Sequence, residues 1–90
     1  MTDAPMTDTE NLPDLALTLE QDLLEKHGPM IANDALRAAL GYSSMNAFRQ
    51  ALVRKTVPVP VFSVEKRRGK FALVKDVARW LAKVRNDALE

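Results

Sequence analysis

Apolar side chains recur at helical spacing in four stretches of this 90-residue chain, and glycine or proline bounds most of them. The first stretch predicts a helix that begins near Pro13 or Asp14 and ends at residues 27–29. Its apolar stripe consists of Leu15, Leu19, Leu23 and Leu24. Packing on the domain's own core is the favoured interpretation of this stripe. Leu12 and Leu17 lie off the stripe, which keeps a dimer contact open.

Two short helices joined by a glycine-containing turn are predicted in the middle of the chain. Asn33 is expected to cap the first of them, and Gly41 to end it in a left-handed backbone conformation. Ser43 or Ser44 can accept a hydrogen bond from the free amides that begin the next helix, expected over residues 44–55. This layout is that of a helix-turn-helix.

A stiff connector and a β-hairpin are predicted after these helices. Pro58 and Pro60, separated by a β-branched residue, favour an extended backbone. Strands are expected over residues 61–64 and 71–74, with a short glycine-containing loop between them. The apolar pair at residues 30–31 could form a brief strand that pairs with this hairpin.

The last periodic stretch predicts a helix over residues 75–88, which Trp80 is expected to anchor against the helix-turn-helix core. Residues 1–11 have no apolar periodicity and are expected to form a disordered acidic tail. Residues 12–90 then form one domain. The predicted fold class is α+β, mainly α: a winged helix-turn-helix with an N-terminal helix, the helix-turn-helix, a two-stranded basic wing and a C-terminal helix.

Composition argues against several classes of function. A domain of this size encloses a catalytic cavity only with difficulty, and the isolated glycines form no phosphate-binding loop, so we expect no enzyme. With no cysteine and His27 alone, we expect no metal site and no cofactor. No apolar run approaches the length of a membrane span and no signal peptide is evident, so a cytoplasmic location without membrane contact is expected.

Charge is divided unevenly along the chain. Residues 1–34 carry eight acidic residues against Lys26 alone, a net charge of −7. Residues 35–90 carry twelve Lys and Arg against four acidic residues, a net charge of +8. Basic residues can simply keep helix surfaces soluble. A split between halves instead favours a polyanionic partner for the basic half.

Two groups of polar and basic residues suit a nucleic-acid partner. The outer face of the predicted 44–55 helix carries side chains that can contact guanine or adenine edges, although solvated outer faces are also common. The loop over residues 65–70, called the basic loop below, holds four cations in five positions. The residues expected to bind DNA are Ser43, Ser44, Asn46, Arg49, Gln50, Arg54, Lys66, Arg67, Arg68 and Lys70.

The order of these motifs resembles that of MerR-like winged helices, and more narrowly the small AlpA-like and excisionase-like regulators of prophages and mobile elements. The resemblance covers residues 30–82 and rests on the segments 40–44, 47–49, 57–62, 67–71 and 76–81. It implies sequence-specific binding of double-stranded DNA, with the 44–55 helix in the major groove and the basic loop near the adjacent minor groove. The long dimerisation helix and effector domain of full-length MerR regulators are lacking, so no small-molecule ligand is implied.

Two functions therefore follow from the sequence. The first is a DNA-binding transcriptional regulator or excisionase-type factor, acting as a homodimer or by head-to-tail assembly on DNA. The alternative is a protein-interaction module, such as an anti-repressor or recruiting factor, that uses the N-terminal leucine-bearing helix. The acidic N-terminal segment could also fold over the basic face and weaken DNA binding.

Overall fold

The computed structural model describes residues 11–89 of the chain. Within these residues the fold is α+β and mainly helical, with four helices and one two-stranded sheet. In chain order the elements are α1 (Asn11–His27), β1 (Met30–Ala32), α2 (Asn33–Leu40), α3 (Met45–Arg54), β2 (Phe71–Leu73) and α4 (Val74–Ala88). The predicted tail lies outside the described residues except for Asn11, which already belongs to α1.

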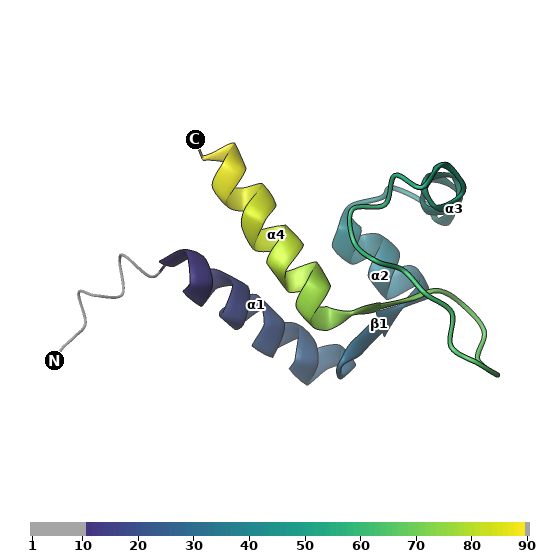
Figure 1. Ribbon diagram of the computed structural model, residues 1–90, viewed down its shortest axis with the longest axis horizontal. Coiled ribbons are helices and arrows are strands. Elements are labelled where there is room, and N and C mark those ends of the chain that lie inside the picture. The colour runs from purple at the N-terminus through teal and green to yellow at the C-terminus, as the bar shows by residue number, and fades with distance from the viewer. Residues whose placement is uncertain (1–10, 90) are drawn as a thin grey trace, which may run out of the picture.

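The helices form two groups on opposite sides of the short sheet. α1 and α4 lie along one side and make the most extensive contact between any two elements, whereas α2 and α3 lie on the other side (Figure 1). β1 leads directly from α1 into α2, and β2 leads directly into α4. The sheet therefore connects the α1–α4 pair to the α2–α3 pair.

The sheet confirms the predicted pairing of residues 30–31 with the later β segment. β1 and β2 are antiparallel, with Ile31 opposite Ala72 at the centre of the register. The ladder is extended at both ends: the Val74 amide donates to the Pro29 carbonyl at 2.9 Å, and the Asn33 amide donates to the Lys70 carbonyl at 3.0 Å.

The predicted strand over residues 61–64 is wrong, because it is reduced to one bridge. Phe62 and Phe71 exchange two backbone hydrogen bonds of 2.8 Å. In this register the next hydrogen-bonded pair on the N-terminal side of Phe62 would use Pro60, which has no amide proton to donate. The next pair outward would use the Val64 carbonyl, which instead accepts from the Arg67 amide at 3.0 Å in a tight turn. Pairing therefore ends on both sides of Phe62.

The core draws its largest fully buried side chains from both sides of the sheet. They are Phe48, Ile31, Leu36, Val74 and Val77. Burial of an aliphatic or aromatic side chain of this size stabilises a fold by about 1.5–3 kcal/mol. Trp80 packs against this cluster as predicted, but it is only half-buried. Smaller residues of α4, such as Val77 and Ala78, make the fully buried contacts.

The leucine stripe of α1 is only partly confirmed. Leu15, Leu19 and Leu23 are half-buried, and Leu23 packs against the core cluster. Leu24, which the spacing predicts to be buried, is 38% exposed, and Leu17 is 52% exposed. The side chain of Leu12 lies outside the described set. Among the described residues, no helix has the length and apolar character needed to cross a bilayer.

Candidate nucleic-acid interface

The turn between α2 and α3 is built by backbone hydrogen bonds at a left-handed glycine. Gly41 has φ +87°, as expected from its position. Its amide donates to the Ala38 carbonyl at 3.1 Å, and the Tyr42 amide donates to the Arg37 carbonyl at 3.1 Å. These two bonds satisfy carbonyl groups that the end of α2 leaves without helical partners. The backbone thus leaves α2 in one defined direction.

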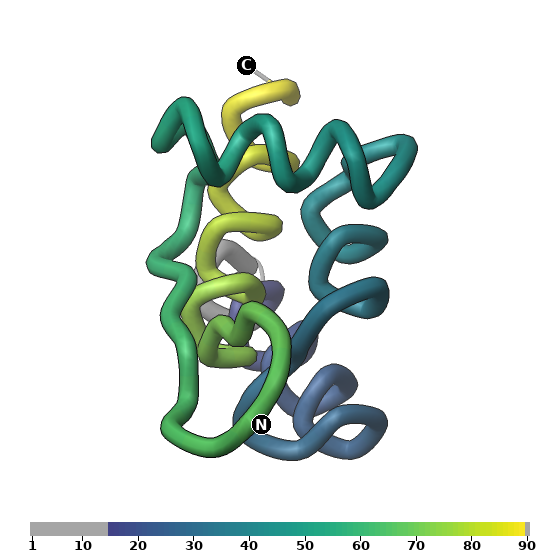
Figure 2. The backbone as a smooth tube through the Cα atoms, turned by 90° about the vertical axis from the view of Figure 1, so that its right-hand side faces the viewer, coloured from purple at the N-terminus to yellow at the C-terminus, as the bar shows by residue number. Residues whose placement is uncertain are grey.

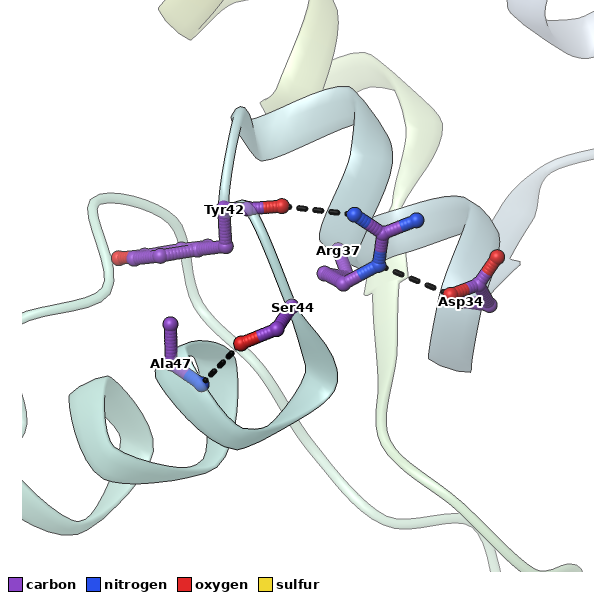
Figure 3. Close-up of polar contacts among 5 residues, drawn as sticks. All are labelled: Asp34, Arg37, Tyr42, Ser44 and Ala47. Atoms are coloured by element: carbon purple, nitrogen blue, oxygen red, sulfur yellow. Dashed lines mark hydrogen bonds and ion pairs between the residues drawn. The ribbon is translucent and has the colours of Figure 1, made fainter.

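Ser44, and not Ser43, caps α3. The Ser44 hydroxyl oxygen accepts a hydrogen bond from the Ala47 amide at 3.1 Å (Figure 3). The Ser44 backbone is extended, which is the usual conformation of an N-cap residue. Ser43 is exposed in the turn. The two serines left open by the sequence are thereby distinguished.

Arg37 ties α2 to the turn, a role that the sequence did not predict. Its Nε donates to the Asp34 carboxylate at 2.8 Å, and its Nη1 donates to the Tyr42 carbonyl at 2.7 Å (Figure 3). Arg37 is therefore half-buried, although helical periodicity places it on an outer face. The hydrogen bond and charge of Arg37 lower the pKa of the Asp34 carboxyl. The i, i+3 spacing of Asp34 and Arg37 is the signal that was available in the sequence.

An aromatic contact holds the two helices together at the same turn. The rings of Tyr42 and Phe48 lie 5.6 Å apart between centroids and are tilted by 39°. Phe48 is fully buried, and Tyr42 packs over the core from the turn. The prediction that Tyr42 covers the helix junction is confirmed. The angle of α3 is therefore set by packing as well as by the caps.

α3 turns all of its predicted DNA-contacting side chains to solvent. Phe48 and Ala51 are buried, whereas the outer face, formed by Asn46, Arg49, Gln50, Val53 and Arg54, is exposed. No polar side chain of this face forms a hydrogen bond or ion pair with another described residue. α3 ends at Arg54, one residue before the predicted end, because Lys55 adopts a left-handed conformation with φ +61°. The Thr56 amide then donates to the Ala51 carbonyl at 2.9 Å.

The basic loop exposes its cations at the end of a tight turn. Lys66, Arg67, Arg68 and Lys70 are all exposed, and Lys66 adopts φ +65°. The Lys70 ammonium lies 3.5 Å from the Ser63 hydroxyl, so this side chain is directed back toward the base of the loop. None of the four cations is paired with an acidic side chain among residues 15–89.

Asn33 fastens the base of the basic loop to the start of α2. The Asn33 side-chain carbonyl accepts a hydrogen bond from the Lys70 backbone amide at 3.1 Å, and the Asn33 backbone amide donates to the Lys70 backbone carbonyl. The side chain also fills the space beside Gly69, where an added Cβ would clash with the Asn33 Oδ1. The prediction that Asn33 is the N-cap of α2 is wrong. Asn33 has φ +52°, and Ala32 occupies the cap position without a side-chain hydrogen bond.

α3 and the basic loop lie on one side of the molecule. Figure 1 places both at the edge farthest from α1, and Figure 2 shows them on the face turned to the viewer, with α3 above and the loop below. A concavity of about 400 Å³ connects the two, lined by Arg49, Leu52, Val53 and Lys70. The structure thus brings Arg49 and Lys70 together, although they are 21 positions apart in the sequence.

Comparison of the chain with family models, with curated proteins and with solved structures gave no match. The resemblance to MerR-like proteins therefore stays a prediction from the order of the motifs. Among the described residues, no three His, Asp or Glu side chains gather in a way that could hold a metal ion.

Proposed function

We propose that this protein binds double-stranded DNA in a sequence-specific manner, as a small winged helix-turn-helix protein. In this proposal α3 enters the major groove and the basic loop acts as the wing, on the backbone or in the adjacent minor groove. The observation that carries the proposal is that α3 and the basic loop lie on one side of the molecule. The basic side chains expected to bind DNA are exposed there, and none forms an ion pair with another described residue. The MerR-like resemblance suggests regulation of transcription or excisionase-type action as the role of this binding.

The dimensions and charges of this side suit a duplex. α3 has ten residues, and an α-helix with its side chains is about 10–12 Å across, which fits a major groove about 12 Å wide. Lys66, Arg67 and Arg68 can neutralise phosphates, and this supplies the affinity that does not depend on sequence. Ser43 and Ser44 lie at the positive end of α3, where a phosphate is favoured.

The outer face of α3 supplies the groups for base recognition. Arg49 can contact guanine through two hydrogen bonds, and Asn46 and Gln50 can contact adenine in the same way. These three residues occupy the first two turns of α3, the part that a recognition helix presents to base edges. Arg54 lies at the C-terminal end of α3, and we assign it to the phosphate backbone of the DNA.

The phosphate role of the basic loop is tested by the double variant R67A/R68A. We expect weaker binding to all duplexes. The slope of log K against log salt concentration should become shallower by about 0.9 for each phosphate that is no longer neutralised. The matched control is R79A/R85A, which removes two exposed arginines of α4, a helix that lies on the other side of the sheet from α3 (Figure 1). Equal affinity of R67A/R68A and the wild type in an anisotropy titration, or an equal decrease in the control, would contradict this assignment.

The base-recognition role of α3 is tested by selection of bound sites from random duplex DNA. N46A, R49A and Q50A should each change the recovered sequence at one or two positions. Each bidentate pair that is removed should lower the discrimination between the right and the wrong base by about 1–3 kcal/mol. A uniform decrease of affinity on all sequences would argue against base recognition. The symmetry of the selected site also distinguishes a two-fold dimer, with recognition helices about 34 Å apart, from head-to-tail assembly.

A protein-interaction module is the second candidate function, and the exposure of α1 favours it. Leu17 and Leu24 are seven residues apart, so they share one face of the helix, and both are exposed. A titration with random duplex DNA at low and high salt separates the two functions. Micromolar, salt-dependent binding supports the DNA-binding function, and its absence supports the interaction module. If the acidic segment inhibits binding, deletion of residues 1–11 raises DNA affinity at low salt.

A further inference from the structure

Val53 is the most exposed large hydrophobic residue among those the structure describes. Its exposed fraction is 81%, compared with 70% for Leu89 at the end of α4. A β-branched side chain also loses rotamer freedom in a helix, so an exposed valine adds nothing to the stability of α3. Neither the core nor the caps of α3 use this side chain. Its position is therefore not explained by folding.

The surroundings of Val53 combine apolar and cationic groups. Val53 and Leu52 provide the apolar part of the concavity between α3 and the basic loop, and Arg49 and Lys70 provide its charges. Arg49 precedes Val53 by four residues and so lies on the same face of α3. Lys70 comes from the base of the basic loop, which Asn33 holds in place through the Lys70 amide.

We infer that Val53 contacts the 5-methyl group of a thymine in the bound duplex, next to the base pair that Arg49 contacts. The inference rests on the proposed DNA-binding function. The thymine methyl is the apolar group that base edges present in the major groove, and aliphatic side chains recognise it by contact. Lys70, which lines the same concavity from the basic loop, suits a phosphate that flanks such a base. Val53 is thus a specificity residue that prefers an A·T pair at one position.

The test removes single methyl groups from the DNA. A duplex obtained by site selection is prepared with one thymine at a time replaced by deoxyuridine, which keeps the hydrogen-bonding edge and lacks the methyl. Wild-type protein should bind one of these duplexes about fourfold more weakly, the factor expected for burial of one methyl group. V53A should bind the thymine and uracil duplexes equally. V84A, which truncates an exposed valine of α4, should keep the wild-type difference.

The outcomes separate the inference from the function on which it rests. The inference is overturned if wild-type protein binds every uracil duplex as tightly as the parent, or if V53A keeps the fourfold difference. It is also overturned if the selected site has no A·T pair, and in all three cases specific DNA binding itself stands. Failure of the wild-type protein to bind any duplex overturns both the proposed function and the inference. V53A is expected to fold, because alanine has the higher helix propensity.

Discussion

Replacing Gly69 with alanine should destabilise the protein by roughly 2–3 kcal/mol. Gly69 has φ +107°, and a residue with a Cβ is strained by about 1–2 kcal/mol at positive φ. The new Cβ would also clash with the Asn33 Oδ1, so the Asn33 amide must move. That movement breaks the 3.1 Å hydrogen bond from the Lys70 amide, at a further cost of about 0.5–1.5 kcal/mol.

Urea denaturation of a small set of variants measures the two contributions separately. G28A and G41A are the matched controls, because both glycines have positive φ and an added Cβ meets no described atom within 4 Å. These controls should lose only the backbone contribution. In the N33G background, which removes the Asn33 side chain and tolerates φ +52°, G69A should also lose only that contribution. The coupling between positions 33 and 69 should be about 1 kcal/mol, the size of one such hydrogen bond.

Two results would refute this reasoning. The first is a cost of G69A no greater than that of G41A. The second is the same cost of G69A with and without the Asn33 side chain, within the roughly 0.3–0.5 kcal/mol by which independent sites add. Either result would mean that Asn33 does not hold the basic loop. Thermal unfolding gives an independent reading, because 1 kcal/mol corresponds to a Tm shift of roughly 4–8 °C in a domain of this size.

Three further predictions concern α2 and α3. S44A should lower the free energy of unfolding by about 1 kcal/mol through removal of the N-cap, while S43A should change it by less than about 0.5 kcal/mol, as measured in urea. K55G should raise it by about 0.5–1 kcal/mol, because glycine relieves the φ of +61°; an unchanged urea midpoint would contradict this. Arg37 lowers the pKa of Asp34. The stability that the Asp34–Arg37 pair contributes is therefore present above the ordinary carboxyl pKa and is lost as pH falls through the lowered pKa. D34N should therefore lose less stability than the wild type on acidification, and identical pH profiles would contradict the pairing.

The features predicted correctly around the α2–α3 turn depend on neighbours in the sequence. Gly41 ends α2 because the left-handed conformation is open to glycine, and the bonds that follow reach only residues 37 and 38. Ser44 caps α3 through a bond to Ala47, three residues away. The sequence leaves the choice between Ser43 and Ser44 open because it depends on which of the two has the extended backbone, and this depends on how the turn packs.

The wrong predictions concern partners that are distant in the sequence. Asparagine is a common N-cap residue, but the Asn33 side chain accepts a hydrogen bond from the Lys70 amide, 37 residues later. The 61–64 segment has strand-forming residues, but its register against β2, with Phe62 opposite Phe71, places Pro60 where the ladder needs an amide donor. Leu24 continues the spacing of a buried stripe, but the contact of α1 with α4 leaves it exposed. Periodicity identifies which residues can be buried, and packing selects among them.

By itself, the sequence determined the helices, the turn between α2 and α3, the exposed cations and the polar outer face of α3. These depend on backbone conformation and on hydrogen bonds within a few residues, which the local chain decides. Only the tertiary structure decided that α3 and the basic loop share one side, that Asn33 fixes the loop, and that Val53 stands exposed beside Arg49 and Lys70. Those relations arise when β2 pairs with β1 and the core closes around Phe48, because only then do distant segments come into contact.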